Sequence, residues 1–163
     1  MARRHPHALP SAELDDRLRS HGLRATRQRR AVHAALARHH DHPTAESLHR
    51  EVRRRMPGLS LATVYKALEA LVRAGASGRI VHADGVARYD ARTDQHDHRR
   101  CLRCGRVEDL ELPHRPDRIA DIPGGKFSIT GYRLELLGHC ARCAAAGRPT
   151  VTQHSFSHRG ETR

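Results

Sequence analysis

Cys101-Leu102-Arg103-Cys104-Gly105 is the first of two cysteine motifs in this chain of 163 residues, and Cys140-Ala141-Arg142-Cys143 is the second. In a CxxC motif, two thiolates reach one ion from a tight turn, and two such motifs complete a tetrahedral four-cysteine zinc site. Gly105 suits the backbone angle of that turn. Because four sulfur ligands leave no coordination position open, we predict a structural zinc ion that stabilises the C-terminal half, bound by Cys101, Cys104, Cys140 and Cys143.

Two other interpretations of the cysteines are a pair of disulfides and a thioredoxin-like redox centre. A redox CxxC motif is expected beside a βαβ pattern, and no such pattern surrounds either motif. In a reducing compartment, paired cysteines favour metal or redox chemistry over structural disulfides. Structural zinc is therefore the favoured interpretation.

The segment just before the first cysteine motif is rich in His and Asp. His96 and His98 share one side of an extended chain, because side chains alternate with a period of two. Asp90 lies upstream and Asp109 downstream of this pair. Three or more nitrogen and oxygen ligands without sulfur suit Fe²⁺, Mn²⁺, Zn²⁺ or Ni²⁺. From spacing alone, a metal site and a solvated polar linker both remain open.

The N-terminal half predicts four helices, each with a hydroxyl residue at its start and apolar residues at helical spacing behind it. Gly22, Pro57-Gly58 and Gly75 mark three of the ends. The predicted N-caps are Ser11, Thr26, Thr44 and Ser60.

A change to short alternating runs follows the fourth helix. Residues 79–82 and 86–89 flank Ala83-Asp84-Gly85, and Asp-Gly between two such runs predicts a β-hairpin. Helices followed by a hairpin are typical of a winged helix-turn-helix, in which residues 61–74 would enter the major groove of DNA. Beyond it we predict strands over 107–112 and 127–137, with a short helix over 116–122, so the fold class is α+β.

Composition limits the possible functions. The net charge is +12, which attracts polyanions such as nucleic acid. An excess of Arg over Lys, typical of a GC-rich genome, is the plainer explanation of this charge. No run approaches the roughly 18 apolar residues of a membrane span, and the N-terminus lacks the apolar region of a signal peptide. We therefore expect a cytoplasmic protein with no membrane partner.

Four separate motifs resemble one family. They are Arg24-Ala25-Thr26-Arg27-Gln28-Arg29, His42-Pro43-Thr44-Ala45, residues 60–68 (SLATVYKAL) and residues 96–105 (HDHRRCLRCG). In this order they resemble the ferric uptake regulator family, and the resemblance extends from about Leu18 to Cys143.

The resemblance implies a homodimer that binds a palindromic double-stranded DNA operator. It implies a winged-helix DNA-binding domain over 1–90 (with 1–10 as a flexible arm), a hinge over 91–99, a dimerisation and zinc domain over 100–146, and a flexible tail over 147–163. A regulatory metal would bridge the two domains and favour the closed, DNA-binding dimer. Tyr65 and Lys66 stand in the recognition helix where the family meets DNA, and Arg24 near the second helix is a candidate phosphate contact. The alternative for each of the three is a surface side chain without a DNA contact.

The resemblance also implies a branch of the family. Peroxide-sensing members bind the regulatory metal with three His and two Asp, and this chain has His42, Asp90, His96, His98 and Asp109 at those positions. Iron-sensing members usually carry Glu where Asp109 stands. The implied regulatory metal is Fe²⁺ or Mn²⁺. With iron, peroxide would convert His42 or His96 to 2-oxo-histidine and end repression. Because this reaction is a one-way modification of the protein itself, the protein would not be an enzyme.

Three other functions are weighed against this one. A sensor of iron, manganese, zinc or nickel itself has the same motifs and no peroxide role. A zinc-dependent hydrolase would use the His/Asp cluster, but the chain lacks a general-base motif such as H-E-x-x-H. A bare zinc-ribbon module leaves the N-terminal helices and the hairpin unexplained.

Overall fold

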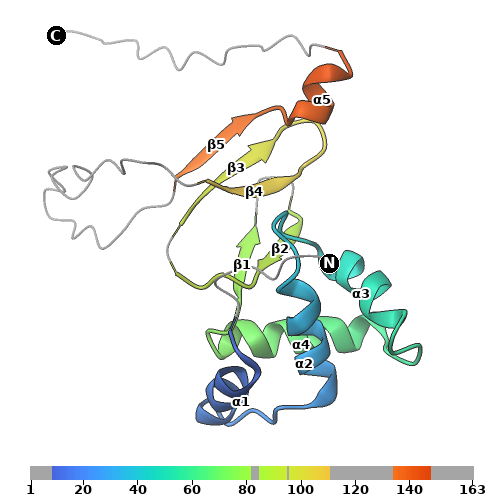
Figure 1. Ribbon diagram of the computed structural model, residues 1–163, viewed down its shortest axis with the longest axis vertical. Coiled ribbons are helices and arrows are strands. Elements are labelled where there is room, and N and C mark those ends of the chain that lie inside the picture. The colour runs from blue at the N-terminus through green and yellow to red at the C-terminus, as the bar shows by residue number, and fades with distance from the viewer. Residues whose placement is uncertain (1–8, 82–84, 95, 111–133, 148–163) are drawn as a thin grey trace, which may run out of the picture.

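A computed structural model describes residues 9–81, 85–94, 96–110 and 134–147, and it confirms the α+β class (Figure 1). The helical half is built from α1 (Ser11–Ser20), α2 (Arg27–Leu36), α3 (Ala45–Arg53) and α4 (Leu61–Arg73). The chain continues through β1 (Gly78–Val81), β2 (Ala87–Asp90), β3 (Asp97–Cys101), β4 (Val107–Leu110), β5 (Glu135–Gly138) and α5 (Ala141–Ala145). In Figure 1 the β1–β2 hairpin lies between the helices and the sheet of β3, β4 and β5.

Three of the four predicted N-caps are confirmed. The side-chain oxygens of Thr26, Thr44 and Ser60 each accept a backbone N–H bond from the first turn of α2, α3 and α4. Such a bond pairs a donor that the helix itself leaves without a partner. The donors belong to Arg29, Ser47 and Thr63.

The predicted N-cap Ser11 is wrong by one residue. Pro10 is the N-cap of α1, with ψ at 151°, and Ser11 is the first helical residue without a capping bond. The carbonyl of Pro10 accepts the N–H of Leu14 at 2.9 Å, so the helix starts directly after the proline. A proline at the N-cap costs the helix no hydrogen bond, because the N-cap residue contributes its carbonyl to the helix and not its N–H.

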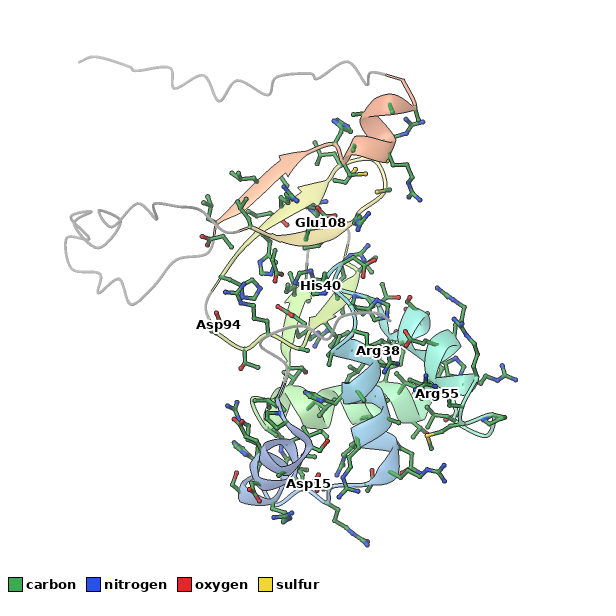
Figure 2. The ribbon with its side chains drawn as sticks, in the orientation of Figure 1. Asp15, Arg38, His40, Arg55, Asp94 and Glu108 are labelled. Atoms are coloured by element: carbon green, nitrogen blue, oxygen red, sulfur yellow. The ribbon has the colours of Figure 1, made fainter. Side chains whose placement is uncertain are left out.

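The core of the helical half is aliphatic. Helix α4 packs against α2 and α3, and the fully buried side chains include Leu36, Leu48, Val64 and Leu68. Charged residues cover the outside: Asp15 of α1 accepts two bonds of 2.8 Å from Arg30 of α2, while other side chains such as Arg55 project into solvent (Figure 2).

The predicted hairpin is present as the antiparallel pair β1–β2, with Arg79 opposite Tyr89. Gly85 has φ of +74°, a conformation that glycine adopts readily. The N–H of Tyr89 donates to the carbonyl of Pro43 at 3.1 Å, which ties β2 to the loop before α3. The helices and the hairpin follow one another in the order expected of a winged helix-turn-helix.

The second sheet has the order β4-β3-β5, with β3 antiparallel to β4 and parallel to β5. In this register His98 of β3 lies opposite Asp109 of β4. Strand β3 begins at Asp97, inside the predicted hinge segment 91–99. Strands β4 and β5 lie within or beside the predicted strands 107–112 and 127–137.

Several expectations fall outside the described residues. These are most of the arm over 1–10, the turn residues Ala83 and Asp84, the helix over 116–122, the beginning of the strand over 127–137, and all but the first residue of the tail over 147–163. None of the helices in the described ranges is long and apolar enough to cross a membrane.

The capping analysis predicts the effect of two serine substitutions. Ser60→Ala should lower the free energy of unfolding by about 1 kcal/mol, because α4 loses the acceptor for the N–H of Thr63. Ser11→Ala is the matched control and should change it by less than about 0.5 kcal/mol, because this hydroxyl caps nothing. Urea unfolding of the zinc-containing proteins measures both, and equal losses would contradict the assignment.

Candidate metal centres

The four cysteines form one cluster at the far end of the sheet. Cys101 ends β3, Cys104 lies in the turn after it, Cys140 is the N-cap of α5 and Cys143 is within that helix. One ligand atom from each residue lies within 4.8 Å of all the others. The sulfurs of Cys104 and Cys140 are 3.9 Å apart, close to the roughly 3.8 Å between sulfurs that each lie about 2.3 Å from a tetrahedral zinc ion. The cluster can therefore hold zinc.

The state of the thiols supports zinc over disulfides. All four cysteines are free, and a disulfide would need sulfurs about 2.05 Å apart. Gly105 has φ of +67°, the unusual backbone angle expected in the first turn. Burial raises the pKa of the Cys101 thiol, but backbone hydrogen bonds of the two cysteine turns outweigh it and lower the pKa to about 5. A thiolate at neutral pH is the form that binds a metal.

The structure also brings the predicted His and Asp residues together. Their ligand atoms lie within 4.8 Å of one another, although they come from five places in the chain. Strand pairing sets His98 against Asp109, and the alternation of β3 brings His96 to the same side as His98, with ring centres 4.5 Å apart. The loop before α3 contributes His42, and the end of β2 contributes Asp90. The cluster thus joins the helical half to the sheet.

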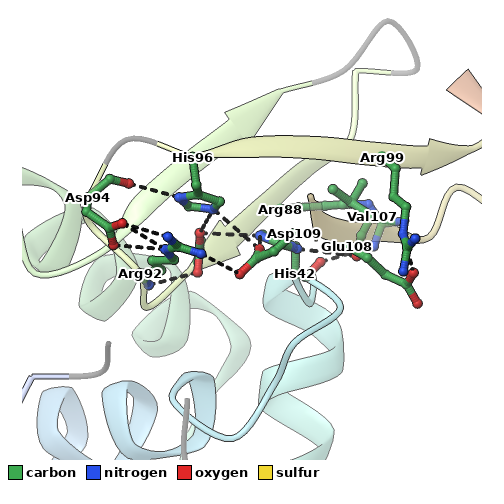
Figure 3. Close-up of polar contacts among 10 residues, drawn as sticks. His42, Arg88, Arg92, Asp94, His96, Arg99, Val107, Glu108 and Asp109 are labelled. Atoms are coloured by element: carbon green, nitrogen blue, oxygen red, sulfur yellow. Dashed lines mark hydrogen bonds and ion pairs between the residues drawn. The ribbon is translucent and has the colours of Figure 1, made fainter. Parts of the chain in front are cut away.

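The ligand atoms of this cluster lie close together, and Figure 3 shows His42, His96 and Asp109 turned toward one another. Nε2 of His42 lies 3.3 Å from Oδ2 of Asp90 and 3.0 Å from Oδ1 of Asp109. Nε2 of His96 lies 2.9 Å and 3.3 Å from the same two oxygens. Nε2 of His98 is also buried and has no hydrogen bond within the described residues. A buried polar atom without a partner is costly, and a cation shared with the other ligand atoms would satisfy it.

Backbone carbonyls fix the orientation of two of the imidazoles. Nδ1 of His42 donates to the carbonyl of Val107 at 3.3 Å, and Nδ1 of His96 donates to the carbonyl of Asp94 at 2.8 Å. A carbonyl only accepts, so the proton must be on Nδ1 and the lone pair of Nε2 is left for a metal. Metal-binding histidines are commonly held in this way.

Charge in the metal-free cluster is balanced by protons. Burial lowers the pKa of His42, but Asp109 and Asp90 outweigh it and raise the pKa to about 9. The same two carboxylates outweigh burial at His96 and raise its pKa to about 10. Burial and the two neighbouring imidazoles lower the pKa of His98 to about 4. Burial raises the pKa of Asp90 and of Asp109, but His42 and His96 outweigh it and hold both pKa values well below the usual range.

The backbone at His42 is unusual. Its φ is +49°, in the left-handed region that few side chains adopt. Two contacts from β2 hold the loop there: Arg88 donates to the carbonyl of His42 at 3.2 Å, and Tyr89 to that of Pro43. Movement of the hairpin would therefore move a candidate metal ligand.

The three expected DNA-contacting residues lie on the surface. Tyr65 and Lys66 are exposed on α4, and Arg24 is exposed just before α2. The hydroxyl of Tyr65 donates to the carboxylate of Glu46 at the start of α3. Their contact with DNA stays a prediction.

Sequence reasoning missed three residues that surround the His/Asp cluster. The side chain of Arg88 donates to the carbonyl of His42, and the guanidinium of Arg92 lies beside Asp109. The backbone carbonyl of Asp94 accepts the Nδ1 proton of His96. The short spacing between Asp90 and Arg92 is the one local feature of the sequence that could have pointed to Arg92. The other contacts depend on how β2, β3 and β4 meet in the fold.

A helical half with a hairpin, a sulfur-free His/Asp cluster at the junction and a four-cysteine cluster in the sheet are the arrangement expected of a metal-responsive regulator of transcription. Residues 20–137 match the ferric uptake regulator family, and the chain belongs to this family. Proteins of the family are dimeric DNA-binding regulators and not enzymes.

Individual relatives have different named functions. A peroxide-responsive repressor of Staphylococcus epidermidis is 31% identical over 132 residues, which cover 80% of this chain and 87% of the relative. The structure of a zinc-bound manganese uptake regulator has a TM-score of 0.64 at 32% identity, over 78% of this chain and 98% of the other. The peroxide stress regulator of Campylobacter jejuni has a TM-score of 0.61 at 30% identity, over 78% and 97% of the two chains.

Removal of one sulfur ligand should release the structural zinc. Cys104→Ser is expected to lower the zinc that survives a mild chelator from about one ion per chain to almost none, because three sulfurs do not close the site. His98→Gln alters only the other cluster and should keep this zinc. Zinc analysis after desalting measures both, and a Cys104→Ser protein that retains its zinc would contradict a site made of four cysteines.

Metal binding at the His/Asp cluster should displace protons. With pKa values of about 9 and 10, His42 and His96 are protonated at neutral pH in the metal-free protein, whereas a metal needs their neutral forms. Raised pKa values therefore oppose binding at low pH, and the apparent Mn²⁺ affinity should rise from about pH 6.5 to about pH 9. Titration calorimetry in buffers of different ionisation enthalpy counts the protons released.

The matched control for this experiment is His39→Gln. Asp41 and Glu51 also raise the pKa of His39, but this residue lies outside the cluster. Its replacement should leave the proton release unchanged, and a pH-independent Mn²⁺ affinity in the unmodified protein would refute proton competition.

Proposed function

We propose that this chain is a metal-dependent transcriptional repressor that binds palindromic operator DNA as a homodimer and releases it in response to peroxide. The observation that carries the proposal is the buried, sulfur-free cluster of His42, Asp90, His96, His98 and Asp109 at the junction of the two halves. A cation shared by ligands from both halves favours the arrangement in which the halves lie together. The regulatory metal is Fe²⁺ or Mn²⁺, and zinc fills the four-cysteine cluster.

The sheet supports the dimer in this proposal. Strand β5 lies at the edge of the sheet formed by the described residues, with Leu136 46% and Leu137 55% exposed. An apolar edge strand is a surface that another chain covers readily. A two-fold dimer would present two copies of α4 to two half-sites, with Arg24, Tyr65 and Lys66 contacting DNA.

The ligand set supports peroxide as the signal. His42, Asp90, His96, His98 and Asp109 would hold Fe²⁺, and the iron would supply the chemistry by which H₂O₂ oxidises a ligand. One oxygen atom of H₂O₂ would enter the imidazole ring of His42 or His96 to give 2-oxo-histidine, and the other would leave as water. Because Nε2 of His42 and Nε2 of His96 each lie within 3.3 Å of both carboxylates, both rings border the same space, and either oxidation would weaken the cluster.

A second candidate is a sensor of the metal itself. The similarity to a manganese uptake regulator at 32% identity favours it, since that relative is about as similar as the peroxide-responsive repressor. The two candidates differ in one outcome: only a peroxide sensor loses DNA binding when H₂O₂ meets the iron-loaded protein.

Peptide mass spectrometry tests the proposal. The zinc-containing protein is loaded with Fe²⁺ or Mn²⁺, treated with a low dose of H₂O₂, and assayed on genomic DNA fragments selected by the Mn²⁺ form. We expect one added oxygen on the His42 or His96 peptide and loss of DNA binding with iron, and neither with manganese. His33, buried in α2 outside the cluster, serves as an internal control and should stay unmodified. Unmodified His42 and His96 with intact iron-dependent DNA binding would establish the metal sensor instead.

A further inference from the structure

Arg92 is a partly buried cation beside the His/Asp cluster. Its side chain is 11% exposed and lies in the connection between β2 and β3. The guanidinium holds Asp94 with contacts of 2.9 Å from Nε and 2.8 Å from a terminal nitrogen. The other terminal nitrogen lies 3.6 Å from Oδ2 of Asp109 on β4 (Figure 3). One arginine therefore links the connection before β3 to a candidate ligand on β4.

The contacts of Arg92 involve the outer oxygens of both carboxylates. Asp109 turns Oδ1 toward His42 and His96 and Oδ2 toward Arg92. Asp90 turns Oδ2 toward the imidazoles, while its Oδ1 accepts the backbone N–H of Arg92 at 2.8 Å. Each carboxylate thus presents one oxygen to the common space among the ligand atoms, and its other oxygen contacts Arg92 on the outer side.

Asp94 extends this arrangement to a third candidate ligand. Its side chain fixes the guanidinium of Arg92, and its backbone carbonyl accepts the Nδ1 proton of His96. Segment 90–94 therefore orients Asp90, His96 and Asp109 together. Neighbours of this kind set the geometry and the affinity of a metal site.

We propose that Arg92 is a positioning residue that limits Asp109 to one oxygen toward the regulatory metal, and so keeps room for a small molecule at that metal. The inference rests on the proposed function, because it requires a metal in the His/Asp cluster. A carboxylate binds a cation through one or both oxygens. The guanidinium of Arg92 lies 3.6 Å from Oδ2 of Asp109, too far for a hydrogen bond but close enough for electrostatic attraction to favour that oxygen facing away from the common space. Without Arg92, Oδ2 of Asp109 turns inward and takes the remaining position.

Visible absorption of bound Co²⁺ tests this inference, because the intensity per cobalt falls when the coordination number rises. The variants are Arg92→Gln, which removes the cation, and Arg92→Lys, which keeps it. Arg99→Gln is the matched control, since Arg99 pairs with Glu108 beside Asp109 and touches no candidate ligand. We expect Arg92→Gln to lower the absorption per cobalt by about threefold, Arg92→Lys to retain most of it, and Arg99→Gln to match the unmodified protein.

The outcomes separate this inference from the proposed function. Co²⁺ binding that is unchanged in His96→Ala would mean that the cluster is not the metal site, which overturns the proposed function. Co²⁺ binding that depends on His96, with the same spectrum in Arg92→Gln and the unmodified protein, would overturn the role of Arg92 alone. Zinc content and thermal unfolding of each variant show that a spectral change does not arise from a damaged fold.

Discussion

Removing the carboxylates of Asp90 and Asp109 from water costs free energy that nearby positive charges and hydrogen bonds offset. In this chain the compensating groups are the imidazoles of His42 and His96, which lie within 3.3 Å of both carboxylates. Arg92 adds a guanidinium near Asp109 and a backbone N–H donated to Asp90. The paired groups belong to the loop before α3, to β2, to the start of β3 and to β4. The junction between the helices and the sheet therefore depends on charge balance, and either protons or a divalent cation can supply it.

The four-cysteine cluster imposes a different constraint. Its sulfurs lie at one end of a small sheet whose described strands are four or five residues long. Short strands bury little apolar surface, so cross-linking by a metal is an effective way to hold them. The two clusters thus lie at different places: the four cysteines lie within the sheet domain, and the His/Asp residues lie where the sheet meets the helices.

The two clusters were predicted from the sequence in different ways. CxxC spacing predicts the four-cysteine cluster without knowledge of the fold, and Thr26, Thr44 and Ser60 cap the helices as expected. The period of two between His96 and His98 left a metal site and a polar linker both open, and the full His/Asp ligand set came from the resemblance to the ferric uptake regulator family. The error at Ser11 arose because Pro10 also serves as an N-cap. Arg92 could not be found in this way, since its contact with Asp109 exists only after β3 and β4 pair. The exposure of Leu136 likewise depends on the order of the strands.

The positive φ of His42 limits how this site can change during evolution. At +49°, the backbone favours Gly, Asn, Asp and His and disfavours bulky or β-branched residues. Among these, only His and Asp are strong metal ligands, so a mutation to Cys or Glu would meet backbone strain as well as altered coordination. A change of ligand type therefore meets backbone strain at position 42 and not at Asp90, His96, His98 or Asp109, whose φ angles are not positive.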